Sequence, residues 1–123
     1  MNPLELAEKW MACVFKTGDL EALRKIFSDD LKFSGPFYNF DSANDYVNAL
    51  RNNPPKNFKY KIIKSYFDNH SSCLIYEFLK LRVLTTMFEI VDGKISHVLL
   101  IFDSRSFQSD LNEKWIQPQK HRK

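Results

Sequence analysis

The chain has 123 residues and a formal net charge of +3, and 44% of its residues are hydrophobic and 27% charged. This length fits one domain, and the composition excludes a disordered or collagen-like chain. Much of the excess positive charge lies in residues 108–123, so the remaining body is nearly neutral and offers no broad basic face to nucleic acid. Cys13 and Cys73 belong to no CxxC or Cys/His cluster, so we expect free thiols and no zinc.

The first third of the chain predicts two helices and a short strand. An Asn-Pro start and an apolar stripe at helical spacing predict a long helix that Gly18 ends. Residues 19–27 predict a second, short helix, and the polar residues 28–30 are expected to break it. Residues 31–33 alternate and predict a short strand.

The middle of the chain predicts a loop, a third helix and then sheet. Residues 35–40 form an aromatic loop, and a helix capped by Ser42 follows and ends in the Asn-Asn-Pro-Pro run. Residues 58–62 alternate and predict a half-exposed strand. The stretch 73–90 is too long for one strand, so we divide it near residues 80–81.

The Val-Asp-Gly-Lys run at 91–94 is a strong hairpin signal, and residues 95–102 form the last strand. Helices come first and hairpin-linked strands follow, which predicts an α+β fold with a curved antiparallel sheet and three helices. We expect a single domain over residues 1–107 and a polar tail over 108–123. The start of the chain shows no apolar signal sequence and no stretch long enough for a membrane span, so we expect a cytoplasmic protein with no membrane partner.

The sequence resembles the nuclear transport factor 2-like superfamily in its SnoaL-like and ketosteroid-isomerase-like branch, over residues 4–107. The segments that carry the resemblance are 7–15, 17–20, 23–27, 28–30, 33–36 and 92–95. The resemblance implies a cone-shaped α+β roll, in which the sheet wraps around the long N-terminal helix and leaves a pocket open at one end. It also implies a homodimer through the outer sheet face, where Leu99 and Ile101 lie.

The resemblance allows a test of the isomerase residues, position by position. The general-base aspartate of the isomerases corresponds to Gly35, and their oxyanion-hole tyrosine corresponds to Met11 or, with a shift of one residue, Trp10. Their protonated aspartate falls near Thr86, whose hydroxyl is a weaker donor. We therefore expect no measurable isomerisation of Δ5-3-ketosteroids, and no cofactor.

Strand alternation, oriented by the resemblance, predicts which side chains face the pocket. Phe37 is expected to shape the mouth, and Glu77, Glu89, His97 and Asp103 are expected to point outward. In this orientation Glu77 and His97 could meet across neighbouring strands as a carboxylate–imidazole pair. The predicted ligand-binding residues are Trp10, Val14, Phe33, Tyr38, Phe40, Tyr46, Tyr76, Phe78, Thr86, Phe88, Val98, Leu100 and Phe102.

Three functions remain open from the sequence. The apolar lining favours a binder of a small apolar molecule that lacks the isomerase residues. A first alternative is a cofactor-independent cyclase, dehydratase or isomerase acting on an apolar carbonyl substrate. A second alternative is a dimeric interaction module whose cone is filled by its own rings.

Overall fold

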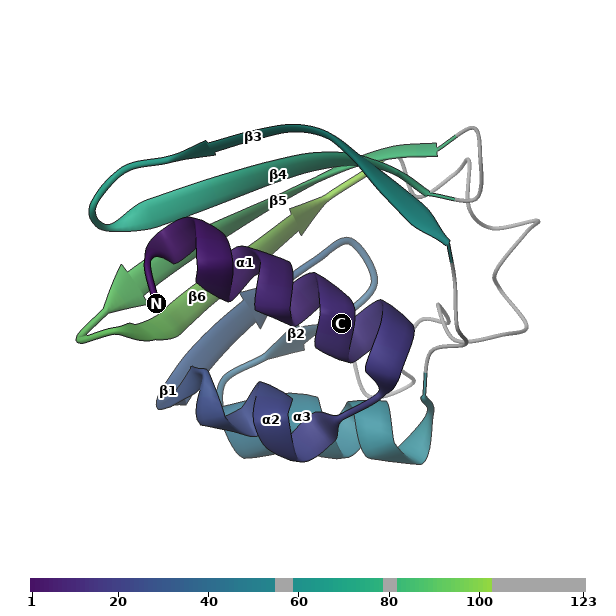
Figure 1. The fold of residues 1–123 in the computed structure, drawn as a ribbon. Coiled ribbons are helices and arrows are strands. Elements are labelled where there is room, and N and C mark those ends of the chain that lie inside the picture. Colours follow the sequence, from purple (N-terminus) through teal and green to yellow (C-terminus); the bar gives the residue numbers. More distant parts are fainter. Residues whose placement is uncertain (55–58, 79–81, 103–123) are drawn as a thin grey trace.

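A computed structural model describes residues 1–54, 59–78 and 82–102. Its sheet has the strand order β2-β1-β6-β5-β4-β3, and α1 crosses the concave face while α2 and α3 lie beside β1 (Figure 1). The predicted α+β cone with three helices is therefore confirmed. The elements are α1 (Pro3–Ala12), η1 (Cys13–Thr17), α2 (Leu20–Lys25), β1 (Phe27–Ser34), β2 (Asn39–Phe40), α3 (Ala43–Asn52), β3 (Tyr60–Phe67), β4 (Ser71–Phe78), β5 (Arg82–Val91) and β6 (Lys94–Ile101).

The continuous helix formed by α1 and η1 begins and ends where its sequence predicts. The Asn2 side chain accepts a hydrogen bond from the backbone of Glu5 at 2.8 Å, and the Glu5 carboxylate accepts one from the backbone of Asn2 at 2.8 Å. This reciprocal pair satisfies two amide groups that a helix start leaves free. The last turn, η1, widens to a π-helix, and Gly18 closes it in the left-handed region with φ 68°.

One prediction about β1 is wrong. Residues 28–30 were expected to break the second helix as a turn, but α2 already ends at Lys25 and these residues lie inside β1. The polar run is compatible with a strand because its side chains find partners there. The Ser28 hydroxyl donates to the backbone carbonyl of Ile95 at 3.2 Å, and the Asp29 carboxylate receives the guanidinium of Arg24.

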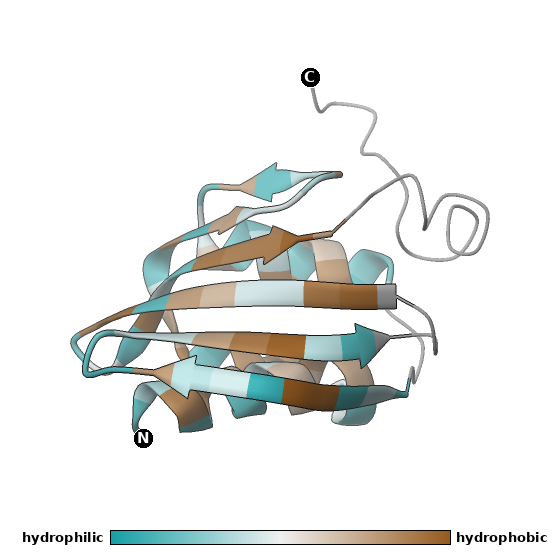
Figure 2. Ribbon diagram, turned by 90° about the horizontal axis from the view of Figure 1, so that it is seen from above, coloured by the Kyte–Doolittle hydropathy of each residue, from teal (hydrophilic) through white to brown (hydrophobic). Residues whose placement is uncertain are grey.

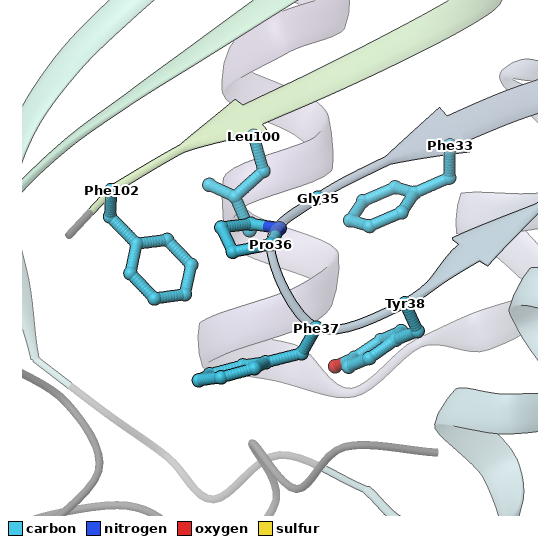
Figure 3. Close-up of a pocket in the computed structure, with 7 residues that line it drawn as sticks. All are labelled: Phe33, Gly35, Pro36, Phe37, Tyr38, Leu100 and Phe102. Carbon is cyan, nitrogen blue, oxygen red and sulfur yellow. The ribbon is translucent and has the colours of Figure 1, made fainter. Parts of the chain in front are cut away.

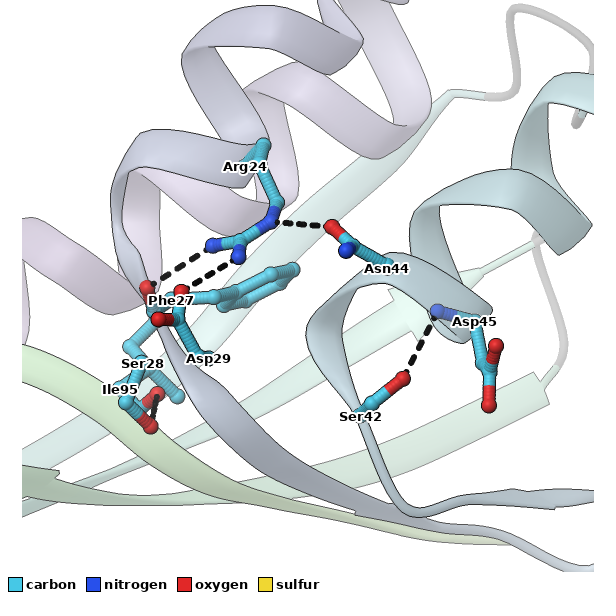
Figure 4. A network of polar contacts seen from close by, with 8 residues as sticks. All are labelled: Arg24, Phe27, Ser28, Asp29, Ser42, Asn44, Asp45 and Ile95. Atoms are coloured by element: carbon cyan, nitrogen blue, oxygen red, sulfur yellow. Dashed lines mark hydrogen bonds and ion pairs between the residues drawn. The ribbon is translucent and has the colours of Figure 1, made fainter.

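Arg24 joins three elements (Figure 4). Its guanidinium donates to Asn44 of α3 at 2.8 Å, to the carbonyl of Phe27 at 3.3 Å and to Asp29 of β1. The hydrogen bond from Arg24 and its positive charge hold the pKa of Asp29 below its ordinary value. These contacts fix the two short helices against β1, which forms one wall of the cone.

The sheet is antiparallel except between β1 and β6, which run parallel. The predicted hairpin at 91–94 is confirmed, with Asp92 and Gly93 at φ 52° and 76°. The predicted division of residues 73–90 is confirmed by the bounds of β4 and β5, although residues 79–81 themselves lie outside the described residues. The aromatic stretch 35–40 is not wholly a loop, because Asn39 and Phe40 pair with β1 as β2.

The predicted alternation of faces holds over residues 84–88 of β5 and 97–101 of β6, whereas a register shift at Glu89–Ile90 leaves Ile95 fully buried. Thr86, Phe88 and Val98 point into the cone and are fully buried, whereas Met87 and Ile101 on the opposite face are about half exposed. Among the described residues, no helix has both the length and the hydropathy that a membrane crossing requires.

Candidate functional site

The cone holds two small adjoining chambers near its open end. The space open to the centre of a water-sized sphere is about 20 Å³ in the inner chamber and about 10 Å³ in the outer one. Each chamber therefore has room for about one water molecule. The inner chamber is lined by Trp10, Val14, Phe15, Phe33, Tyr38, Tyr46, Leu50 and Leu100, and the outer one by Phe33, Gly35, Pro36, Phe37, Tyr38, Leu100 and Phe102 (Figure 3).

The wall between the chambers consists of side chains that line both of them: Phe33, Tyr38 and Leu100. The Phe33 ring stacks on Tyr46 with centroids 4.5 Å apart and lies nearly parallel to Tyr38 at 6.2 Å. Tyr38 lies in the segment between β1 and β2 and is partly exposed, whereas Phe33 and Tyr46 are buried. Movement of Tyr38 and Leu100 would therefore join the chambers without disturbing the buried stack.

The phenol groups are the main polar groups of the cone. The indole Nε1 of Trp10 donates to the Tyr46 hydroxyl at 3.2 Å, and deeper in the cone the hydroxyls of Tyr76 and Thr86 lie 2.8 Å apart. Burial raises the pKa of Tyr38 to about 12 and raises the pKa values of Tyr46 and Tyr76 further. The three phenols therefore stay protonated near neutral pH and cannot act there as general bases.

Among the described residues, neither chamber is lined by a carboxylate, imidazole, amine or thiol, and Asp103, which was expected to point outward, lies outside the described residues. Gly35, at the position of the isomerase base, lines the outer chamber, and a Cβ there would lie 3.3 Å from the Phe33 ring. Met11 is fully buried, and Thr86 is bonded to Tyr76. The described lining can thus enclose an apolar group and offer hydroxyl hydrogen bonds to it.

The expectation that Glu77 and His97 could meet is wrong. Glu77 lies on β4 and His97 on β6, and β5 separates these strands. His97 instead pairs across β5–β6 with Glu89 and lies 3.3 Å from the Ser34 hydroxyl on the outer face. The acid–base pair that the sequence suggested therefore does not form.

The structure divides the predicted ligand-binding residues into three groups. Six line the inner chamber, namely Trp10, Val14, Phe33, Tyr38, Tyr46 and Leu100, and Phe102 lines the outer one. Tyr76, Thr86, Phe88 and Val98 are fully buried beyond the two chambers, and Phe40 packs against Phe33, Tyr38 and Tyr46. The side chain of Phe78 lies outside the described part of the structure. Ligand contact by these residues stays a prediction.

Four lining residues were not among the predicted ones. Phe15 follows Val14 at the end of the first helix, and Leu50 lies one turn after Tyr46 on α3, so helical spacing could have indicated both. Gly35 and Pro36 contribute backbone and ring surface at the end of β1. Nothing in their residue types predicts a binding surface.

The outer face of the sheet carries a second feature (Figure 2). Pairing across β3–β6 aligns Tyr66, Cys73, Met87 and Leu99 in one row. Pairing across β4–β6 aligns Ile75, Thr85 and Ile101 in the next row, which the exposed Lys64 of β3 borders beside Ile75. Tyr66, Met87 and Ile101 are between 45% and 55% exposed, so these rows are open to solvent in the single chain. We call these seven residues the outer patch.

Within the described ranges, no three His, Cys, Asp or Glu side chains come together as metal ligands.

Neither a family model nor a curated protein matches the sequence.

Solved structures share the fold. An NTF2-like protein of unknown function from Cytophaga hutchinsonii superposes with a TM-score of 0.74 at 21% identity, covering 87% of this chain and 95% of that one. An LEH-like epoxide hydrolase from M. tuberculosis gives 0.69 at 18% identity, covering 84% of each chain. A SnoaL-like protein of unknown function from Burkholderia thailandensis gives 0.63 at 17% identity, covering 82% and 94%. The chain therefore has the fold of NTF2-like proteins, and the resemblance seen in the sequence is confirmed at that level.

Proposed function

We propose that the protein binds a small apolar molecule at the open end of the cone and carries out no acid–base chemistry on it. The observation that carries this proposal is the pair of adjoining chambers, which are walled by rings and aliphatic side chains and to which the described part of the chain contributes no carboxylate, imidazole, amine or thiol. Such a lining favours ligands held by burial and a few hydrogen bonds.

The size of the chambers limits the ligand. Each holds about one water-sized sphere, so a molecule with one ring must displace Tyr38 or Leu100 and occupy both chambers. The partial exposure of Tyr38 supports this movement, because a side chain at the surface has space to rotate. Burial of the ligand's apolar surface supplies the driving force, at about 25 cal/mol per Å².

The residues at the chambers do not support isomerase chemistry of the kind named for one structurally similar protein. One similar structure, a putative ketosteroid isomerase from Kribbella flavida, shares 18% identity. In this chain Gly35 offers no base, and the phenols stay protonated because burial raises their pKa values. Without a base, abstraction of a proton next to a carbonyl loses about 10²–10⁴-fold in rate, which supports a binding function.

Titration with toluene, followed by calorimetry and by the fluorescence of a Trp115→Phe variant in which Trp10 is the remaining tryptophan, tests the proposal. We expect saturable binding, and we expect Leu100→Phe, which fills the wall between the chambers, to weaken it about tenfold or more. Val91→Phe, at an exposed position on the distant hairpin, is the matched control and should leave the affinity unchanged. Absence of saturable binding, or equal effects of the two variants, would overturn the proposal.

A second function, homodimerisation through the outer patch, rests on a separate observation. Seven residues form two aligned rows that are mainly apolar on the face away from the helices, and solvent-exposed apolar rows of this kind usually mark a partner surface. We commit to a second copy of this chain as the partner. If toluene does not bind, the small size of the chambers indicates that the cone is filled by its own rings, and dimerisation becomes the favoured function.

We also propose a cytoplasmic location, because both cysteines are unpaired and disulfides are rare in the cytosol.

Sedimentation at micromolar concentration tests the dimer. We expect twice the mass of the 14.6 kDa chain, and dissociation in Met87→Lys, because a lysine at the centre of the patch must lose its hydration to fit between two sheets. Val91→Lys is the control, since Val91 is equally exposed but lies outside the patch. A wild-type protein that sediments only as a monomer contradicts the proposal.

A further inference from the structure

Strand β3 ends the sheet with an open hydrogen-bonding edge. It lies at one margin of the sheet and, among the described residues, pairs with β4 alone (Figure 1). The N–H and C=O groups on the free side of Tyr60–Phe67 can therefore pair with a further extended chain. The opposite margin of the sheet, β2, has only two residues and offers no such length.

Most side chains of β3 are open to solvent. They include three large apolar ones, Ile63, Tyr66 and Phe67, which are between 48% and 55% exposed. Pairing with β4 places Tyr66 on the outer face opposite Cys73, and Phe67 on the concave face opposite the buried Ser72. A strand added at this edge would therefore cover apolar surface on both faces of the sheet.

The charge of this margin indicates the charge of its partner. Residues 59–67 contain three lysines, Lys59, Lys61 and Lys64, and no acidic residue. None of the three forms an ion pair with a described carboxylate, although Glu77 of β4 lies opposite Lys61. Pairing with β4 places Lys61 and Lys64 on the outer face, where carboxylates of an added strand would lie at cross-strand distance from them.

A second copy of this chain does not suit the edge. Antiparallel pairing of two β3 strands would bring the lysines of both copies together along one short ladder, and like charges opposite one another destabilise a sheet. Lysines, and the bulge between Ile62 and Lys64, are also means by which edge strands resist indiscriminate pairing. The same charges attract a chain of the opposite sign, so they restrict the edge to acidic partners.

We propose that the free edge of β3 binds an extended segment of a partner protein in which acidic residues alternate with apolar ones. The main chain of that segment adds one strand to the sheet, its carboxylates face Lys61 and Lys64, and its apolar side chains lie against Phe67 on the concave face. One chain makes both contacts because successive side chains of a strand point to opposite faces. No residue of β3 lines either chamber, so this inference is independent of the proposed ligand.

Two peptides matched in length and pattern test the charge selection. Acetyl-Val-Glu-Val-Glu-Val-Glu-Val-amide, and its counterpart with lysine in place of each glutamate, are titrated into the full-length chain by calorimetry. We expect the glutamate peptide to bind about tenfold more tightly, and its affinity to fall as salt is added, because salt screens exposed charges. In the complex, amide hydrogen exchange should slow at alternate residues of β3, since only the free edge becomes newly paired.

N-methylation of the glutamate peptide tests pairing through the main chain. Methyl groups on every second amide block one edge of an extended peptide and leave the other edge free. Two such peptides, methylated at the valines or at the glutamates, therefore differ in which edge is blocked. We expect one of them to bind like the parent peptide and the other to lose about tenfold or more in affinity.

Replacement of two lysines tests the site in the protein. Lys61→Gln combined with Lys64→Gln should weaken binding of the glutamate peptide about tenfold and leave the unfolding midpoint unchanged, because both side chains are exposed. Lys25→Gln combined with Lys94→Gln is the matched control. It makes the same change of charge at exposed positions of α2 and β6 and should leave the affinity unchanged.

Four outcomes contradict the proposal. Equal binding of the glutamate and lysine peptides would exclude charge selection, and equal binding of the two methylated peptides would exclude strand addition. Binding of neither unmethylated peptide would show that the lysines and the bulge only protect the edge. Slower exchange of the same amides at rising protein concentration, without peptide, would identify a second copy of the chain as the occupant.

Discussion

Phe88 and Met87 are neighbours on β5, yet they belong to opposite regions of the molecule. Phe88 is fully buried inside the cone, with its ring edge-to-face on Trp10 at 5.3 Å, whereas Met87 is 45% exposed at the centre of the outer patch. One alternating strand thus supplies a closed interior and an open apolar exterior. The interior stabilises the single chain, and the exterior contributes stability only if a partner covers it.

Truncation of these neighbours gives the largest expected contrast. Phe88→Ala should lower the free energy of unfolding by about 3–5 kcal/mol, because it removes a buried ring and leaves a cavity. Met87→Ala should cost less than about 1 kcal/mol under conditions where the chain is monomeric. Denaturant unfolding at low protein concentration measures both, and similar losses at the two positions would show that the outer patch is already covered.

The two phenols of the inner chamber should also differ. Tyr46→Phe leaves the buried Nε1 of Trp10 without its acceptor and should cost about 1–3 kcal/mol of unfolding free energy. Tyr38→Phe removes no hydrogen bond to a described residue and should change stability by less than about 0.5 kcal/mol. Unfolding of the two variants in the same buffer compares them, and a greater loss for Tyr38→Phe would contradict the assignment of partners.

Alkaline pH should destabilise the interior through the same phenols. Between pH 10 and about 12, an unfolded Tyr38 loses its proton while the folded one keeps it, because burial raises its pKa to about 12. The folded state then binds more protons, so the free energy of unfolding falls as pH rises, by at most about 1.4 kcal/mol per pH unit for this group. Unfolding midpoints from pH 9 to 12 should therefore fall less steeply in Tyr38→Phe than in the wild type. If the midpoints of the two proteins fall equally steeply with pH, the Tyr38 hydroxyl is exposed to water and its pKa is not raised by burial.

Labelling of the two cysteines compares the buried interior with the outer patch and should give the smallest effect. Cys13 is buried at the start of η1, and Cys73 lies partly exposed in the outer patch. Burial raises the pKa values of both thiols, so labelling should be slow at pH 8. Cys73 should react first in dilute protein and become protected as concentration rises, whereas Cys13 should react only on unfolding. A Cys73 labelling rate that is independent of concentration would argue against the dimer.

Local signals in the sequence predicted the parts of the fold that depend on nearby residues. The Asp92-Gly93 hairpin and the Asn2 and Ser42 helix starts were predictable because turn and cap geometry depend on a few neighbouring residues. The side chains of β5 that point into the cone, such as Thr86 and Phe88, followed from alternation once the resemblance had indicated which face of the last strand points inward. The strand at residues 28–30 was not predictable from its own residues. Phe27 and Lys32, on either side of it, pair with Ile95 and His97 of β6, and these distant contacts override the local preference of Ser-Asp-Asp for a turn.

The candidate site was predictable in its residue types but not in its volume. Trp10, Phe33 and Tyr46 were expected to line the cone, and they do surround the inner chamber. The space that remains depends on how their rings are tilted and stacked, which follows from packing across segments far apart in sequence. The hydrogen bond from Trp10 to Tyr46 joins residues 36 positions apart, and no motif predicts it.

The position of β6 has a consequence for biosynthesis. Because β6 lies between β1 and β5, it joins the β1–β2 pair to the β3–β5 sheet, and β1 has no partner on that side until Lys94–Ile101 has left the ribosome. The helices α1, α2 and α3 are synthesised before most of the sheet, so their apolar faces stay exposed to solvent until the later strands are made. Contacts of such long sequence separation form slowly. We therefore expect a nascent chain that stops before β6 to be aggregation-prone and to bind chaperones that recognise exposed apolar segments.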